Sequence, residues 1–550
     1  MILEVTITVK AEEENNKKII LQEILKECRK KLSPKDLDYL RKNPLTNDSY
    51  LLIKKSIDAR HGQIKLHLRY KVFIGQPVDM QINKSDCLPV WKKADENKRV
   101  IIIGSGPAGL FAALRLLEDG ITPVILERGK KTSERRQDIA KISTKDLVDA
   151  NSNYCFGEGG AGTFSDGKLY TRSNKRGNIN SVLQIFAHFG ADSRILTDAH
   201  PHIGTDKLPK IINNMRNKII ELGGQVHFNS LFTDLICSDC DGKKIVKGVK
   251  YRELTSGQEK EVFADYVILA TGHSAPDVYE LIAKISPLSL EAKTFAAGVR
   301  VEHPREIIDS IQFHGRGDSK LGAAEYRVTC QIDGRGLYSF CMCPGGFVVP
   351  SSSGPDEIVV NGMSAAARNS KWSNAAIVVE IRPEDIPLEF YDKAKKMGCP
   401  ALAGLLFRNY LEKLTKENGE GQAAPAQKLV DFLANKKSTE FPSTSYTPGL
   451  YSSNLNDWLP EHIRSRLHKG FVEIDKSMKG FICPQALMIA SETRTSTPVR
   501  ICRDKESLQC TGLCNLYPSG EGAGYSGGIV SSAMDGINIS SKIAEKFINF

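Results

Sequence analysis

Three glycines at positions 104, 106 and 109 have the spacing of a loop that binds the pyrophosphate of a dinucleotide. In such a loop the first glycine allows a tight turn, the second lets the ligand approach the backbone, and the third lets a helix pack closely against a strand. The pyrophosphate then binds the free N–H groups at the start of that helix. The residues of the predicted loop are Gly104, Ser105, Gly106, Pro107, Ala108 and Gly109.

The segments on either side of this loop have the hydrophobic patterns of a β-α-β unit. Residues 100–103 are an apolar run typical of a buried strand, residues 110–117 have a helical pattern, and residues 123–126 form a second short strand. Glu127 ends the second strand, where an acidic residue binds a ribose hydroxyl, and Arg128 follows it. The sequence therefore predicts a dinucleotide site at the carboxyl edge of a parallel sheet.

Two later segments favour FAD as the dinucleotide. An apolar strand over residues 266–270 runs into Thr271 and Gly272, as the closing strand of the nucleotide fold does in many flavoproteins. In the glycine-rich turn before the last helix, Glu521 is expected to bind the ribityl chain, and the helix N-terminus to face the flavin edge where negative charge accumulates on reduction. The cofactor residues assigned to this turn are Gly520, Glu521, Gly527, Gly528 and Ile529.

Residues 157–162 are a further glycine-rich segment. We expect the backbone N–H groups of Gly159, Gly160 and Gly162 to line the flavin or its pyrophosphate as an anion nest, with an ordinary loop as the alternative. Residues 522–527 also have the GxGxxG spacing, but too few residues follow them for a helix, a second strand and its acid. This second match is therefore interpreted as part of the flavin turn.

Three residues are candidates for catalysis. His273 follows the closing strand and is placed to reach the cofactor edge, although a hydrogen bond at a helix start is an equal alternative. Burial of Glu158 in the glycine loop would raise its pKa toward a role in proton transfer, whereas an exposed loop acid is the simpler interpretation. Arg494, with Arg300, has the chemistry to bind a substrate carboxylate, and structural ion pairs explain both arginines equally well. No metal site is predicted, because the pair at 200–202 lacks a third ligand cluster.

Thirteen cysteines are scattered along the chain without the spacing of a disulfide framework, so we expect reduced thiols. Cys237 and Cys240 have the CxxC spacing, but they run into an expected hairpin tip at 241–242, which favours a structural role. Cys341 and Cys343 would share one face of a strand, where they either contact the flavin or, as we expect, simply pack.

The composition indicates a globular protein with a basic N-terminal part. The 550 residues carry a net charge of +10, of which residues 1–99 contribute +7. Such a module would suit nucleic acid, an acidic partner or an anionic substrate, but a solvated lysine-rich surface is the interpretation that we favour. No apolar run reaches the roughly 18 residues of a membrane span. Because the first residues also lack a signal-peptide pattern, we expect a cytoplasmic protein without membrane contacts.

Four segments make up the predicted architecture. Residues 1–94 have a β-α-β-β pattern that suggests a ferredoxin-like α+β module. Residues 95–291 and 481–550 are expected to form a doubly wound, Rossmann-like FAD-binding domain of the α/β class. Residues 292–480 have mixed strand patterns and no second nucleotide fingerprint, so we expect them to form an inserted α+β substrate or cap domain.

Several longer strings are similar to those of a known family; they cover residues 55–60, 156–169, 270–274, 340–346, 492–498 and 518–529. On these strings the chain resembles the uncharacterised FAD-dependent dehydrogenase/oxidoreductase family, which has a single FAD domain with a glutathione-reductase-like nucleotide fold. The resemblance implies an FAD cofactor bound by the fingerprint glycines, Glu127 and the turn at 520–529, and it implies no settled substrate.

These features together predict an FAD-dependent oxidoreductase that transfers two electrons between a small organic molecule and the flavin. Because only one complete nucleotide fingerprint is present, NAD(P)H is expected to bind only transiently, over the flavin face. Two alternatives stay open. One is a flavoprotein that acts on RNA or tRNA through the basic N-terminal module, and the other is a non-catalytic, FAD-binding redox sensor.

Overall fold

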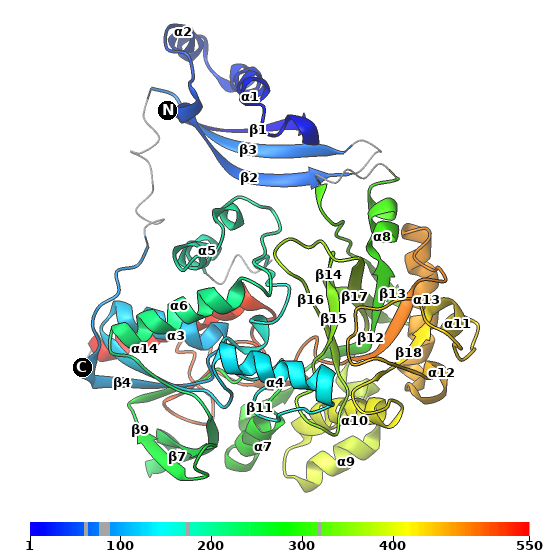
Figure 1. The fold of residues 1–550 in the computed structure, drawn as a ribbon. Helices are drawn as coiled ribbons and strands as arrows, with labels where there is room; N and C mark the ends of the chain where they lie inside the picture. Colours follow the sequence, from blue (N-terminus) through cyan, green and yellow to red (C-terminus); the bar gives the residue numbers. More distant parts are fainter. Residues whose placement is uncertain (60–63, 76–87, 172–176, 241–242, 316–320, 549–550) are drawn as a thin grey trace.

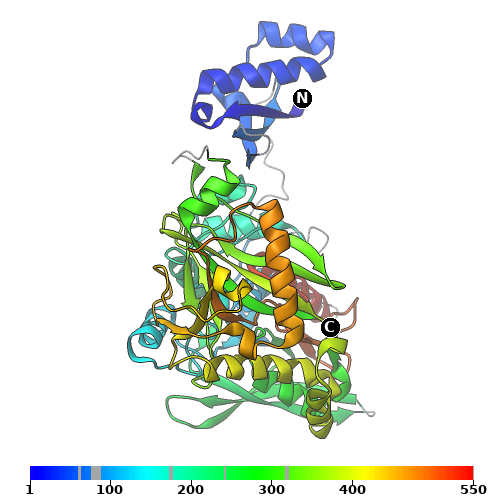
Figure 2. The ribbon, with the colours of Figure 1, turned by 90° about the vertical axis from the view of Figure 1, so that its right-hand side faces the viewer.

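The structure is a computed structural model, which describes residues 1–59, 64–75, 88–171, 177–240, 243–315 and 321–548. A small N-terminal module stands at one end of a larger body with a mixed α/β fold (Figure 1). The view in Figure 2, turned by 90°, separates the two parts clearly.

Five parallel strands form the sheet that carries the dinucleotide fingerprint. In spatial order they are β22 (Leu516–Pro518), β10 (Tyr266–Leu269), β4 (Asp95–Ile103), β5 (Ile121–Leu126) and β6 (Gln225–His227). Strands from the start, middle and end of the domain therefore lie side by side. Every residue of β5 and β10 is buried, as expected for parallel strands that are covered on both faces.

Helices cover one face of this sheet, and an antiparallel sheet covers the other (Figure 1). The helices are α3 (Pro107–Glu118), α5 (Ile179–His188), α6 (Leu208–Glu221) and α14 (Ile529–Ile548). The antiparallel strands are β7 (Ser230–Cys240), β8 (Lys243–Glu253) and β9 (Glu259–Phe263). Since successive residues of a strand point to opposite faces, Val100 and Ile102 pack with the helices while Ile101 and Ile103 pack with β7 and β8.

A seven-stranded sheet forms the second part of the body, in the order β13-β14-β17-β12-β20-β18-β19. Its strands are β12 (Phe295–Pro304), β13 (Thr329–Ile332), β14 (Arg335–Cys343), β17 (Trp372–Ile381), β18 (Ala424–Lys428), β19 (Leu450–Ser452) and β20 (Leu487–Glu492). β20 lies beyond residue 480, where the predicted C-terminal part of the FAD-binding domain begins, but it pairs with β12 and β18 of this sheet.

The remaining elements connect and cover these sheets. The helices are α4 (Thr132–Lys145), α7 (Pro276–Ile285), α8 (Arg305–Gln312), α9 (Leu388–Lys396), α10 (Ala403–Glu417), α11 (Leu429–Leu433), α12 (Leu455–Trp458) and α13 (Glu461–Ser477). The strands are β11 (Leu290–Ala292), β15 (Phe347–Pro350), β16 (Val360–Met363) and β21 (Val499–Ile501). None of the helices in the described ranges has both the length and the apolar character that a membrane span requires.

The N-terminal module has its own sheet and its own hydrophobic core. It consists of β1 (Ile2–Lys10), α1 (Lys17–Lys31), α2 (Pro34–Lys42), β2 (Tyr50–Asp58) and β3 (Lys65–Phe73). The antiparallel order β1-β3-β2 is that of a split β-α-β unit, and within residues 1–59 and 64–75 no fourth strand pairs with it. A complete ferredoxin-like fold is therefore not confirmed. Lys55 joins the module to the larger body through backbone hydrogen bonds of 2.8 Å to Thr197 and Ala199.

Helices α3 and α14 lie so close together that only a glycine fits between them. A Cβ atom on Gly536 would lie 2.1 Å from the carbonyl oxygen of Ala108, in the first turn of α3. This contact determines how the two helices lie against each other, and both of them begin at the carboxyl edge of the parallel sheet.

We expect Gly536→Ala to force α3 and α14 apart and to lower the free energy of unfolding by about 1–3 kcal/mol, the usual cost of overpacking. Thermal unfolding of the purified protein measures this change. Glu545→Ala, at an exposed position of the same helix, should leave the unfolding midpoint unchanged. A Gly536→Ala protein as stable as the parent would contradict the packing argument.

Candidate functional site

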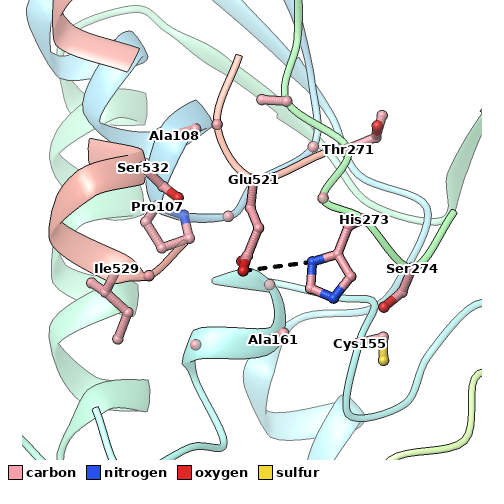
Figure 3. A pocket seen from close by; sticks show the side chains of 18 of the residues that line it. Pro107, Ala108, Cys155, Ala161, Thr271, His273, Ser274, Glu521, Ile529 and Ser532 are labelled. Carbon is pink, nitrogen blue, oxygen red and sulfur yellow. Dashed lines mark ion pairs between the residues drawn. The ribbon is translucent and has the colours of Figure 1, made fainter. Parts of the chain in front are cut away.

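A cavity of about 370 Å³ lies where the parallel sheet meets the seven-stranded sheet. Ile103, Leu126 and Ala270 line it at the carboxyl ends of β4, β5 and β10, and Phe340 and Cys341 of β14 line it from the other side. Ligands of doubly wound folds bind at this edge of the parallel sheet. Figure 3 shows part of the lining.

The three fingerprint glycines are required for different reasons. A Cβ atom on Gly104, whose φ is 103°, would lie 2.4 Å from the carbonyl oxygen of Ala270. A Cβ atom on Gly109 would lie 2.0 Å from the carbonyl oxygen of Gly104. At Gly106 the nearest protein atom, on Gly160, would be 3.9 Å away. Packing within the protein therefore explains Gly104 and Gly109, whereas Gly106 lines the cavity and leaves room for a ligand.

Two helices begin at the cavity. No side chain caps the N-terminus of α3, and Pro107 and Ala108 of its first turn line the cavity. α14 begins at Ile529, after Gly527 and Gly528, at which a Cβ atom would meet nothing within 4 Å. The free N–H groups and the dipoles of both helices favour negatively charged groups at this position.

The Glu127 carboxylate connects three loops at the end of the cavity next to β5. One oxygen accepts hydrogen bonds from the backbone N–H and the hydroxyl of Ser105, at 2.9 and 2.8 Å. The other oxygen accepts hydrogen bonds from the N–H groups of Gly129 and Gly157, at 2.9 and 3.0 Å. Glu127 is buried and lines the cavity, so it holds the fingerprint loop and the glycine loop in place beside a ligand.

His273 and Glu521 face each other inside the cavity (Figure 3). His273 Nδ1 lies 3.7 Å from a carboxylate oxygen of Glu521. His273 Nε2 lies 2.9 Å from the carbonyl oxygen of Arg494, which only accepts, so this nitrogen carries a proton and donates it. Both side chains are thus in the cavity where the sequence predicts them.

Most of the predicted cofactor residues line the cavity; these are Gly104, Gly106, Pro107, Ala108, Glu127, Arg128, Gly160, Gly162, Thr271, Gly272, Gly520, Glu521, Gly527, Gly528 and Ile529. Ser105, Gly109 and Gly159 do not line it. Ser105 binds Glu127, and a Cβ atom on Gly159 would lie 2.0 Å from the Thr163 hydroxyl oxygen. In the structure the contacts of these three residues are with neighbouring loops.

Glu158 lies outside the cavity lining, contrary to its predicted role in proton transfer at the cofactor. One of its oxygens accepts a hydrogen bond of 2.8 Å from the backbone N–H of Thr132, at the start of α4, and the other binds Arg216 at 2.7 Å. Burial raises the pKa of Glu158, as expected, while Thr132 and Arg216 oppose the shift. The side chain therefore anchors α4 and α6 to the glycine loop.

Arg494 and Arg300 are not free to bind a substrate carboxylate. Two nitrogens of Arg494 bind the two oxygens of Glu412, at 3.0 and 2.8 Å, and a further contact of 2.6 Å joins Arg494 to Glu357. Arg300 is fully buried and binds Glu492 at 3.0 Å. The structural ion pairs, which were the alternative, therefore explain both arginines, although Arg494 lines part of the cavity.

The end of the cavity next to the seven-stranded sheet contains residues that the site prediction did not include. They are Asp166, Lys168, Tyr170 and Asn361. Lys168 Nζ lies 3.7 Å from the Asp166 carboxylate, which also binds Arg368 at 3.0 Å. Burial alone would raise the pKa of Asp166, but Lys168 and Arg368 lower it to about 2. The only signal in the sequence is that Asp166 and Lys168 belong to one of the strings that resemble the family.

The other singled-out motifs lie outside this cavity. Cys237 and Cys240 are exposed at the end of β7, and the hairpin tip expected at 241–242 lies outside the described residues. His200 hydrogen-bonds to a carboxylate and His202 to a backbone carbonyl. In the part of the chain that the structure describes, no three His, Cys, Asp or Glu side chains are grouped as metal ligands.

Comparisons with known proteins match both parts of the body. Residues 97–149 match the FAD binding domain, and residues 294–495 match the family described as FAD-dependent protein, C-terminal domain-like. An uncharacterized protein of Clostridium beijerinckii (strain ATCC 51743 / NCIMB 8052) is 38% identical over 514 residues, which are 90% of this chain and 92% of that protein. Among solved structures, CtdE in complex with FAD is 14% identical, with a TM-score of 0.31 over 82% of this chain and 84% of that chain. THI4 of Thermovibrio ammonificans is 18% identical, with a TM-score of 0.26 over 36% of this chain and 66% of that chain.

The residues of the cavity fit FAD. Gly106 leaves space for the pyrophosphate, and the N-termini of α3 and α14 supply free N–H groups for its negative charge. Ser519 lines the same cavity, and its buried hydroxyl has no hydrogen-bond partner among the described residues. A buried hydroxyl without a partner is unfavourable, so it indicates a polar ligand group at this point.

We expect Gly106→Val to abolish retention of FAD without unfolding the protein, because the new side chain would occupy ligand space and not protein space. The flavin absorbance per chain after purification, together with the thermal unfolding midpoint, measures both effects. Gly354→Val is the matched control, because a Cβ atom at Gly354 meets no atom of the described residues within 4 Å and Gly354 lies outside the cavity lining. A Gly106→Val protein fully loaded with FAD would contradict the assigned site.

Asp166→Asn should lower the free energy of unfolding by about 1–3 kcal/mol at neutral pH, because it removes the carboxylate that binds Lys168 and Arg368, of which only Arg368 keeps a second partner, Glu325. The pKa of Asp166 is lowered to about 2, so its stabilising effect is complete above the ordinary carboxyl range and is lost as the pH falls. Unfolding measured from pH 7 downward should therefore show a difference from the parent that narrows only below about pH 4. Asp192→Asn, which affects an exposed ion pair, should change the free energy of unfolding little at any pH. A difference in unfolding free energy between Asp166→Asn and the parent that stays constant down to the lowest pH would refute the assignment.

Proposed function

The chain belongs to the family of FAD-dependent proteins, and we propose that it is an oxidoreductase that transfers two electrons between FAD and a small anionic organic molecule. FAD supplies the two-electron chemistry when it is bound. The observation that carries the proposal is one cavity with two chemically different ends. Its first end is lined by the dinucleotide-binding loops, and its second end by Lys168, Tyr170, Cys341 and Asn361.

The second end has the chemistry of a site for an anionic substrate. Burial alone would lower the pKa of Lys168, but the neighbouring Cys341 and Cys343 sulfurs and the Asp166 carboxylate raise it, so the ammonium group keeps its charge. Tyr170 adds an aromatic ring to the lining. A fixed positive charge beside an aromatic ring favours a planar, negatively charged molecule.

An open groove of about 600 Å³ adjoins this end and shares Tyr170, Phe340, Cys341 and Gly527 with the cavity. Arg327, Tyr338 and Tyr525 also line it. Cationic and aromatic side chains suit a planar ring that carries phosphate or carboxylate groups. We therefore propose that the substrate reaches the cavity through this groove, and that NAD(P)H binds in it transiently as an electron donor.

The direct test is an anaerobic titration of the FAD-loaded protein with NADH, NADPH and fractions of a metabolite extract. Loss of the oxidised-flavin absorbance with at least one anionic component is expected, and the absorbance should return when air is admitted. If dithionite reduces the flavin and none of these components does, the proposal fails.

We expect Arg327→Glu to slow reduction of the flavin by an anionic donor by about tenfold at low ionic strength, because charge reversal removes electrostatic attraction at the groove. The difference should shrink in about 0.5 M salt, which screens charges more than a few ångströms apart. Stopped-flow measurement of the bimolecular rate constant tests this. Lys396→Glu makes the same change in net charge at an exposed position of α9, outside the groove lining, and should react like the parent. An equal slowing in both variants would contradict the assigned route.

A further inference from the structure

Residues 340–343 of β14 leave the regular strand geometry. The register of β14 against β17 shifts at this point, and Cys341 has a φ of 44°, a left-handed conformation that is unfavourable for a residue with a side chain. Two cations hold the backbone in this shape. Arg300 donates to the Cys341 carbonyl at 3.2 Å, and Lys168 donates to the Met342 carbonyl.

The two cysteines of this turn have different surroundings. Cys341 is half-buried and lines both the cavity and the groove. Cys343 is fully buried beneath Gly362, where an added Cβ atom would lie 2.9 Å from its sulfur. Hydrogen bonds join Cys343 to the Cys341 carbonyl oxygen, at 3.3 Å, and to the Cys341 sulfur. A molecule in the cavity can therefore meet Cys341, whereas Cys343 is buried and in contact with it.

The charges around the pair favour a thiolate on the accessible residue. The hydrogen bond from Cys343 lowers the pKa of Cys341, burial opposes this shift, and Lys168 and Arg300 lower the pKa further. The same hydrogen bond and burial raise the pKa of Cys343. One sulfur is thus prepared to attack, since the thiolate is the reactive form, and the other keeps its proton.

We propose that Cys341 and Cys343 form a redox-active dithiol that reduces small disulfides, with Cys341 as the attacking group and Cys343 as the resolving group. A disulfide needs Cα atoms within about 7 Å of each other. Residues two apart in the chain are separated by at most about 6.6–7.2 Å, the span of a fully extended backbone at about 3.3–3.6 Å per residue, so their Cα atoms lie close to or within this limit. No movement of distant elements is needed to join the two sulfurs.

The reaction balances as a thiol–disulfide exchange. The Cys341 thiolate attacks one sulfur of the small disulfide, whose S–S bond breaks, and the leaving thiolate takes a proton from water. Cys343 then loses its proton and attacks the Cys341 sulfur, and the second half of the small disulfide leaves as a thiol. The protein pair, as thiolate and thiol, loses two electrons and one proton, water supplies the second proton, and the small disulfide becomes two thiols.

Return of the pair to the dithiol state needs two electrons and two protons. Reduced FAD in the same cavity is the donor, and on this point alone the inference rests on the proposed function. The other cysteine in the cavity has a different arrangement, because among the described residues the Cys155 sulfur hydrogen-bonds with Arg494, at 3.3 Å, and with Ser351.

The test uses the FAD-loaded protein, reduced with a phosphine, desalted without oxygen and treated with 2-hydroxyethyl disulfide. Mass spectrometry after alkylation of the remaining thiols should find a single Cys341–Cys343 cross-link and two small thiols released per chain. Before oxidation, iodoacetamide at pH 6 should label Cys341 at least tenfold faster than the exposed Cys237, because thiolate is already present. A cross-link to Cys155, or labelling of Cys341 no faster than that of Cys237, would overturn the inference.

Variants separate the two roles. In Cys343→Ser the reaction should stop at a mixed disulfide on Cys341. In Lys168→Met the rate of iodoacetamide labelling of Cys341 should rise only at higher pH than in the parent. The doubly substituted C237S/C240S protein removes the surface CxxC pair and should form the cross-link like the parent. Formation of the cross-link with a flavin that no donor reduces would refute the proposed function and leave the dithiol standing. Reduction of the flavin by one of these donors without formation of the cross-link would refute the dithiol and leave the proposed function standing.

Discussion

Backbone-to-backbone packing at glycines is the constraint on which the cofactor cavity depends. A Cβ atom on Gly104 would lie 2.4 Å from the carbonyl oxygen at the end of the closing strand, and one on Gly522 would lie 2.3 Å from the carbonyl oxygen of the loop that follows this strand. A Cβ atom on Gly536 would lie 2.1 Å from a carbonyl oxygen in the first turn of α3. These contacts join the beginning, middle and end of the nucleotide domain in pairs. Side chains at any of them would move the loops whose N–H groups face the ligand.

Buried charges around the cavity are mostly neutralised within the protein. Arg494 is paired with Glu412, and Arg300 with Glu492, so that each ion offsets the cost of removing the other from water. What remains for a ligand is the partial positive charge at two helix N-termini and the ammonium group of Lys168, which lies 3.7 Å from the Asp166 carboxylate but also lines the cavity. This distribution suits a cofactor with a pyrophosphate at one end of the cavity and an anionic substrate at the other.

The nucleotide-binding part was predictable because the sequence patterns that define it lie within a short stretch of the chain. The expected strand at 100–103, helix at 110–117 and strand at 123–126 all lie within observed elements of the same type, β4, α3 and β5. The spaced glycines, the start of the helix and the acid that ends the second strand all belong to one β-α-β unit. Hydrophobic periodicity and the residue preferences of turns are therefore enough to locate them. The cofactor lining follows from the same motifs. Of the residues assigned to the cofactor, Ser105, Gly109 and Gly159 do not line the cavity.

The sequence by itself determined the nucleotide fold and the cofactor, since both depend on short stretches whose hydrogen-bonding groups and backbone freedom are set by neighbouring residues. Only the tertiary structure shows which residues line the end of the cavity next to the seven-stranded sheet. Glu158 and Arg494 were plausible catalytic groups until long-range contacts showed that their charges are already paired. Lys168 and Cys341 gained importance for the same reason, because they meet across a separation of more than one hundred residues. The chemistry of a buried charge depends on which distant group neutralises it, and no local pattern records that partner.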